Sequence, residues 1–269
     1  MLRRPLPQRT CAILIAVISC LVTLPGSAAP AGEGDAHTRT LYLIRHGAYV
    51  HDADADPRLG PGISPLGVAQ ARMVAARLVT VPVRFDSLAS STMTRAFETA
   101  MVIHGMFPDL PMTRTALIEE CTPPTPRTAG HPSGEEQSAC VRRLDAAYAD
   151  MFRPARQAEV HDIVVAHANV IRYLVTKALG VDTRAWIGMS LAHASLTIVR
   201  IQPDGKARVL AVGDIGHVPP NLQSWGGASD PELVVPGGWA PHPDGTASTS
   251  GSPGNSAPES LSDQAGAQQ

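Results

Sequence analysis

The stretch Leu41-Tyr-Leu-Ile-Arg-His-Gly47 decides the fold of this chain, because a run of apolar residues ends there in an arginine, a histidine and a glycine. The apolar run favours a buried strand over residues 40–45. In open α/β sheets, binding sites form in the crevice beyond the carboxyl ends of the strands. The Arg-His-Gly triplet is therefore predicted to lie at the edge of a sheet where a functional site would form.

Further runs typical of strands alternate with helical patterns along the chain. Strands are predicted over 85–90, 112–117 and 161–166, and helices over 65–78, 95–104, 135–152 and 170–179. Two closing strands, over 195–201 and 207–212, flank the turn Pro203-Asp-Gly-Lys206. This order predicts a three-layer α/β domain, with a mixed, mostly parallel sheet and helices on both faces.

The first 30 residues have the order of a secretory signal peptide: basic residues, an apolar run over 11–24, and small residues. Cleavage is expected near Ala29 or Ala31, which would make the protein exported, either periplasmic or secreted. The run is shorter than the roughly 20 residues that cross a bilayer, so no stable membrane span is expected after processing. Two alternatives stay open, a lipoprotein tethered at Cys20 and an anchor formed by the uncleaved signal.

The rest of the 269 residues divide into a domain predicted over 38–220 and a tail over 221–269. The tail is rich in Gly, Ser, Pro and Ala, which bury too little apolar surface to offset the entropy of ordering, and we expect it to be disordered. The net charge is -2 and the pI is about 6.5. A chain without a strong basic field is not expected to bind nucleic acid.

Two of the four cysteines, Cys121 and Cys140, remain once the signal peptide is removed. An oxidising compartment would let them form a disulfide, which we predict. Two free buried thiols are the alternative.

Polar residues follow four of the predicted strands, where the strands would meet at one edge of the sheet. The segments are Arg45-His-Gly47, Ser91-Thr-Met-Thr-Arg95, Glu119-Glu120 and His167-Ala-Asn169. Phosphoryl transfer needs a nucleophile in line with the leaving oxygen and positive groups around the phosphoryl oxygens.

These residue types suit that chemistry. A neutral imidazole at His46 can accept the phosphoryl group without a metal. Arg45 and Arg95 can hold phosphate oxygens through forked N–H donors, and a protonated His167 would add a donor. A carboxylic acid must protonate the leaving oxygen and later take a proton from water, and Glu119 or Glu120 is placed for this.

Four segments in this order are similar to the histidine phosphatase superfamily, in its phosphoglycerate mutase-like branch, and within it to the mitochondrial serine/threonine protein phosphatases. They are Leu43-Ile-Arg-His-Gly47, Ser64-Pro-Leu-Gly-Val-Ala-Gln-Ala71, Ser91-Thr-Met-Thr-Arg-Ala-Phe-Glu-Thr-Ala100 and His167-Ala-Asn-Val-Ile-Arg-Tyr173. The resemblance also includes Gly213-Asp-Ile-Gly-His-Val-Pro-Pro220 and extends over about residues 40–220.

The resemblance implies that His46 carries the phosphoryl group, that Arg45, Arg95 and His167 form the phosphate pocket, and that no cofactor is needed. Gly47 and Asn169 are expected beside the substrate, although Asn169 could instead cap a helix or orient His167. The pattern Leu-x-x-Glu-x-x-Pro favours Glu120 as acid and base, whereas the shorter Leu-x-Glu favours Glu119. The implied substrate is phosphoserine or phosphothreonine in proteins, and small phosphate esters suit an exported enzyme equally well.

Other readings of the site remain as alternatives. A pseudoenzyme or scaffold would keep the pocket and bind phosphate without turnover. A phosphoglycerate mutase is disfavoured, because mutases usually carry an Asn shortly after Arg-His-Gly and this chain has Ala48-Tyr49. Residues 51–56 resemble the first half of a calcium loop, but Pro57 and Ile63 break the second half, and we predict no metal site.

Overall fold

The computed structural model describes residues 36–126 and 134–226. The predicted signal peptide, with Cys20 and both expected cleavage positions, lies outside these residues, as does the tail beyond Gly226. Among the residues that are described, no helix is both long enough and apolar enough to span a membrane.

A six-stranded sheet with the order β3-β2-β4-β1-β5-β6 forms the centre of the fold. Its strands are β1 (Arg39–Arg45), β2 (Ser87–Ser91), β3 (Met112–Thr115), β4 (Val160–Ala166), β5 (Leu196–Ile201) and β6 (Ala207–Asp214). The pairs β1–β4, β2–β4 and β2–β3 are parallel, and β1–β5 and β5–β6 are antiparallel. The predicted mixed, mostly parallel sheet is confirmed.

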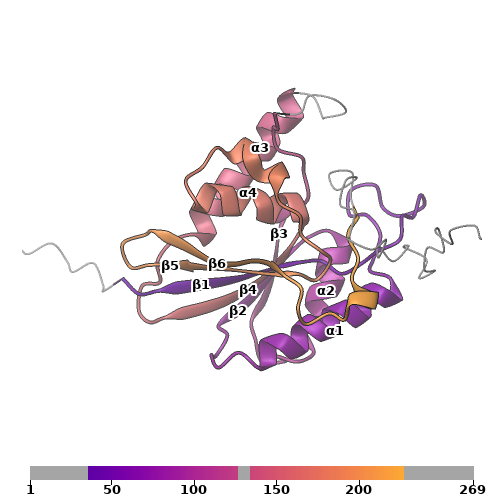
Figure 1. Cartoon of the computed structure of the whole chain (residues 1–269), viewed down its shortest axis with the longest axis horizontal. Coiled ribbons are helices and arrows are strands. Elements are labelled where there is room, and N and C mark those ends of the chain that lie inside the picture. The colour runs from indigo at the N-terminus through magenta and orange to yellow at the C-terminus, as the bar shows by residue number, and fades with distance from the viewer. Residues whose placement is uncertain (1–35, 127–133, 227–269) are drawn as a thin grey trace, which may run out of the picture. The chain divides into compact units, whose positions relative to one another are not determined.

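Helices cover both faces of this sheet, as predicted (Figure 1). They are α1 (Pro65–Val79), α2 (Thr94–His104), α3 (Gly134–Met151) and α4 (Ala168–Ala178), with short 3₁₀ helices at Ala116–Ile118, Thr183–Gly188 and Pro220–Leu222. Figure 1 shows α3 and α4 on one side of the sheet and α1 and α2 on the other.

The central strands separate two hydrophobic cores because successive side chains of a strand point to opposite faces. Leu41 and Leu43 pack with residues of α3 and α4, whereas Tyr42 and Ile44 pack with residues of α1 and α2. All four side chains are at most 5% exposed. Burial on both faces explains why the strand is a continuous apolar run rather than an alternating one.

Some element boundaries differ from the predicted ones. The third strand ends at Thr115 rather than at Leu117, because the Thr115 hydroxyl accepts the Leu117 N–H and starts a 3₁₀ turn. Beyond Pro220, the side chain of Ser224 is 7% exposed and bonded to Gln70 and His193. The composition of the tail could not predict the contacts of Ser224, because its partners Gln70 and His193 are far away in the sequence.

Candidate active site

His46 follows the carboxyl end of β1, where its N–H donates to the Ala166 carbonyl of β4 at 3.0 Å. Its ring Nδ1 lies 2.8 Å from the Gly47 carbonyl, which can only accept, so Nδ1 carries the proton. Nε2 therefore holds the lone pair, and it accepts a hydrogen bond from Arg95 Nε at 3.1 Å. Burial, with the nearby His167 and Arg95, holds the pKa of His46 well below its usual range. The result is a neutral imidazole with a nucleophilic nitrogen facing the pocket.

Gly47 lets the loop after β1 lie directly against the start of α1. A Cβ at Gly47 would lie 2.5 Å from the carbonyl oxygen of Gly67, in the first turn of that helix. The Gly47 N–H donates to Thr99 Oγ1 at 2.9 Å. Ser64 caps α1 by accepting the Gly67 N–H, and Pro65 follows it at the first helical position. The loop that carries His46 is thus fixed by both helices of this layer.

Arg95 and His167 both lie close to the His46 ring. Arg95 belongs to the first turn of α2, is 7% exposed, and lies 5.0 Å from the ring centre of Tyr49. Burial lowers the pKa of Arg95. The ring centres of His167 and His46 are 5.1 Å apart, and His167 Nε2 lies 2.9 Å from Ser91 Oγ.

Burial and nearby positive charge favour the neutral form of His167. Its side chain is fully buried, and burial together with the Arg95 charge keeps its pKa well below the usual range. A phosphate dianion bound beside it would oppose this shift, because a nearby negative charge favours the imidazolium. The cationic donor expected from the sequence would thus form only with a ligand in place.

Arg45 is 3% exposed, and its guanidinium is held by main-chain carbonyls and by a histidine that the sequence interpretation missed. One terminal nitrogen donates to the Leu191 carbonyl. The other donates to the Gly226 carbonyl at 2.5 Å and lies 3.0 Å from His193 Nε2. His193 also approaches the nucleophile, with ring centres 5.4 Å apart.

A topological signal could have found His193. It lies just before β5, and β5 runs antiparallel to β1, with Leu196 opposite Ile44. The start of an antiparallel neighbour lies beside the end of the strand it pairs with, so residues preceding β5 reach the same edge as His46. Tyr49 was missed as well, although its ring centre is 5.4 Å from that of His46.

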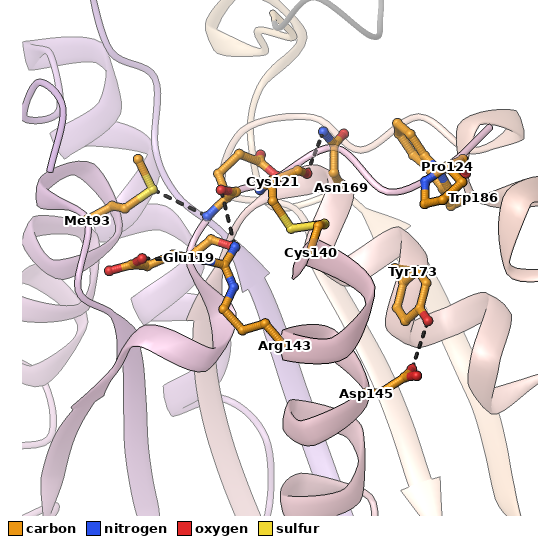
Figure 2. Close-up of a disulfide and its surroundings, with 11 residues drawn as sticks. Met93, Glu119, Cys121, Pro124, Cys140, Arg143, Asp145, Asn169, Tyr173 and Trp186 are labelled. Atoms are coloured by element: carbon orange, nitrogen blue, oxygen red, sulfur yellow. Dashed lines mark hydrogen bonds and ion pairs between the residues drawn. A yellow bond between two sulfur atoms is a disulfide. The ribbon is translucent and has the colours of Figure 1, made fainter. Parts of the chain in front are cut away.

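The two candidate glutamates have different surroundings. Glu119 accepts the Thr92 hydroxyl and pairs with Arg143 at 3.5 Å, so its carboxylate is already engaged. Figure 2 shows Glu119 beside Arg143. The Glu120 carboxyl is partly buried and interacts electrostatically with Arg95 and Arg45. Burial raises its pKa to about 7, against the lowering effect of these two arginines. A carboxyl with a pKa near neutrality suits a group that both gives and takes a proton.

The glutamate loop is fastened to both helices of its layer. Cys121 and Cys140 form a disulfide that joins the loop to α3 (Figure 2). On the same helix, Arg143 donates to the Glu119 carbonyl at 2.7 Å. From α4, the Asn169 amide donates to the Cys121 carbonyl at 3.2 Å. Asn169 therefore braces this loop, and the N-cap position of α4 is taken by His167.

Removing the Cys121–Cys140 bridge is expected to lower both stability and turnover. Closing a loop across 19 residues contributes about 3 kcal/mol in the chain-entropy model. For a domain of this size that corresponds to a melting temperature lower by about 6–12 °C. Turnover should also fall, because the bridge holds the residue that follows Glu120.

Thermal unfolding and initial rates with and without dithiothreitol would measure both effects. The double variant Cys121→Ser/Cys140→Ser is the control. Its melting temperature and rate should equal those of the reduced protein and should not change when dithiothreitol is added. An unchanged melting temperature of the wild-type protein under full reduction would contradict the prediction.

The predicted residues thus converge from four loops on one edge of the sheet. His46, Arg95 and His167 are in mutual proximity, and Arg45 and Glu120 act on the same pocket through their charges. Within residues 36–126 and 134–226, no group of three or more His, Cys, Asp or Glu side chains is arranged to hold a metal ion.

Comparison with known proteins agrees with this geometry. The sequence profile of the histidine phosphatase superfamily (branch 1) matches residues 41–123 and 121–214. The chain is 38% identical over 196 residues to the mitochondrial serine/threonine-protein phosphatase Pgam5 of Caenorhabditis elegans, covering 70% of this chain and 67% of that protein. The human PGAM5 is 33% identical over 190 residues, covering 68% and 65%.

Solved structures share the fold at lower sequence identity. The alpha-ribazole phosphatase of Shigella flexneri has a TM-score of 0.50 at 17% identity, covering 65% of this chain and 96% of that one. The phosphoglycerate mutase of Bacillus anthracis has a TM-score of 0.50 at 20% identity, covering 68% and 96%. The profile match and the identity to curated phosphatases together show that this chain belongs to branch 1 of the histidine phosphatase superfamily and is a phosphatase.

Proposed function

We propose that this phosphatase hydrolyses phosphomonoesters in two steps through a phosphohistidine at His46. The observation that carries the proposal is the pair of contacts made by the His46 ring, with Nδ1 2.8 Å from the Gly47 carbonyl and Nε2 3.1 Å from Arg95 Nε. Because the carbonyl only accepts, the proton is on Nδ1 and the Nε2 lone pair faces Arg95. A nucleophile of this kind needs no base to remove a proton before it attacks.

In the first step, His46 Nε2 attacks phosphorus and the bond to the leaving oxygen breaks. Glu120 gives its proton to that oxygen, so the substrate departs as an alcohol. Arg95 releases His46 Nε2 and, with Arg45 and His167, binds the phosphoryl oxygens. The phosphorylated ring gains positive charge, which the Gly47 carbonyl at Nδ1 stabilises.

In the second step, the Glu120 carboxylate takes a proton from water as the water oxygen attacks phosphorus. The bond to His46 Nε2 breaks, inorganic phosphate leaves, and both groups return to their starting states. The pKa of about 7 supports Glu120 in both roles, because neither protonation state is costly near neutral pH.

Two substrate classes are compatible with this chemistry. The curated relatives are named as serine/threonine-protein phosphatases, which supports phosphoserine or phosphothreonine in proteins. The signal-like first 30 residues support an exported enzyme that acts on small phosphate esters. Comparing kcat/KM for phosphopeptides and for small esters would separate the classes. The mass of the chain recovered after export would show whether the N-terminal residues are removed.

The test of the two-step reaction is rapid quenching of the purified chain with para-nitrophenyl phosphate labelled in its phosphoryl group, in excess EDTA. We expect a burst of nitrophenol and label on the protein that is lost in acid and kept in alkali, as phosphohistidine is. Tight capture of phosphate with neither nitrophenol release nor labelled protein would instead indicate the phosphate-binding pseudoenzyme.

A further inference from the structure

We propose that His193 is a positioning residue for Arg45, and that it orients the guanidinium for phosphate without cancelling its charge. The inference rests on the proposed function, in which Arg45 binds the phosphoryl oxygens. His193 lies between Ala192 and Ala194, just before β5, and it belongs to none of the motifs described above.

The chemistry of the partners fixes the hydrogen-bond directions around His193. A guanidinium only donates, so His193 Nε2, 3.0 Å from an Arg45 terminal nitrogen, is the acceptor. The proton of the neutral ring is then on Nδ1, which donates to Ser224 Oγ at 2.9 Å. The His193 N–H also donates to the Ser224 carbonyl at 2.9 Å. Two bonds to one serine therefore hold the imidazole in the orientation that Arg45 requires.

The series of bonds continues from Ser224 into α1. Gln70 Nε2 donates to Ser224 Oγ at 2.9 Å, and Gln70 Oε1 accepts the Ala48 N–H at 2.9 Å. Gln70 is fully buried, and His193 and Ser224 are 4% and 7% exposed. Buried polar groups in such a network define one geometry, because each loses a partner if another moves.

A neutral acceptor suits this position better than a carboxylate would. Burial, with the Arg45 charge, keeps the pKa of His193 well below its usual range, so the ring stays neutral beside the guanidinium. A carboxylate at the same place would also orient Arg45, but its negative charge would offset the attraction of Arg45 for a phosphate dianion. A neutral imidazole orients the Arg45 guanidinium and leaves its full positive charge to attract the substrate.

Three substitutions at residue 193 separate orientation from charge. His193→Leu removes the acceptor, His193→Gln keeps a neutral acceptor that can reach Arg45, and His193→Glu keeps an acceptor but adds a negative charge. The measurements are kcat/KM for para-nitrophenyl phosphate, the inhibition constant of inorganic phosphate, and the melting temperature of each variant.

We expect His193→Leu to lower kcat/KM by about 10–100-fold, the scale of a misplaced catalytic or binding group, and to weaken phosphate inhibition. His193→Gln should stay within a few-fold of wild type, whereas His193→Glu should lose phosphate affinity as the leucine variant does. Ser224→Ala, which frees the imidazole from its fixed orientation, should give an intermediate loss.

Equal phosphate affinity in the leucine and glutamine variants, with both folded, would overturn the role of the acceptor. Equal affinity in the glutamine and glutamate variants would overturn the role of charge. These outcomes are distinct from failure of the proposed function, which would appear as full activity in a protein that lacks His46.

Discussion

Replacing His46 by alanine is expected to lower kcat by at least about 10⁴-fold, because the variant has no nitrogen to accept the phosphoryl group. Losing a nucleophile that works as a unit with other groups removes most of the rate enhancement. The remaining Arg45, Arg95 and His167 should still hold inorganic phosphate. Single-turnover kinetics with radiolabelled substrate would measure both the rate and the amount of labelled protein.

The matched control is His104→Ala. His104 ends α2, about 14 Å along the helix from Arg95 at 1.5 Å per residue, and its ring contacts only the Leu110 carbonyl among the bonds described. This variant should keep wild-type turnover. Residual turnover in His46→Ala within tenfold of wild type would exclude His46 as the nucleophile.

Glu120→Gln is expected to lower kcat by about 10²–10⁴-fold, the usual contribution of general acid–base catalysis, for substrates with poor leaving groups. Glutamine cannot supply the proton that an alkoxide such as that of serine needs. The loss should be smaller with para-nitrophenyl phosphate, because nitrophenolate departs readily without a proton. Glu119→Gln is the matched control, since the Glu119 carboxylate is already engaged by Thr92 and Arg143.

The pH dependence gives a second measurement on Glu120. With a pKa of about 7, the wild-type enzyme should lose kcat/KM for phosphoserine peptides as the pH rises above 7, since the proton donor is lost. This basic limb should disappear in Glu120→Gln. A limb that persists unchanged in the variant would assign the titration to another group.

The substitution Glu120→Gln is expected to raise stability at alkaline pH although it lowers activity. The folded-state pKa of Glu120 lies above its ordinary value of 4.5, so its contribution to stability is present below pH 4.5 and is lost as the pH rises through 7. Glu120→Gln should therefore be more stable than wild type at pH 8, by the order of 1–2 kcal/mol after allowance for partial exposure, and equal near pH 4. Urea unfolding at pH 8 and pH 4 would measure the difference in unfolding free energy between the two proteins.

Much of the fold could be predicted because local patterns and tertiary packing agree. The run before His46 is apolar throughout since both faces of β1 are buried, and Ser64-Pro65 starts α1 by local capping. The functional site at the Arg-His-Gly triplet could be predicted because the triplet directly follows a strand. These features depend on residues close in sequence, which a single sequence displays.

The rest depends on contacts between distant residues. His193 joins the site only because β5 pairs antiparallel with β1, and Ser224 is ordered by Gln70, which lies in α1. The choice between Glu119 and Glu120 depends on Thr92, Arg143 and the two arginines of the pocket. Composition and spacing within the sequence do not predict such tertiary partners.

Burial that keeps His46, His167 and His193 neutral leaves Arg45 and Arg95 as the permanent positive charges that act on the nucleophile. Two guanidinium groups match the double charge of a phosphomonoester, whereas a phosphodiester brings only one negative charge. The same match applies to inorganic phosphate, the product. Inorganic phosphate is therefore expected to compete with the substrate for these two guanidinium groups.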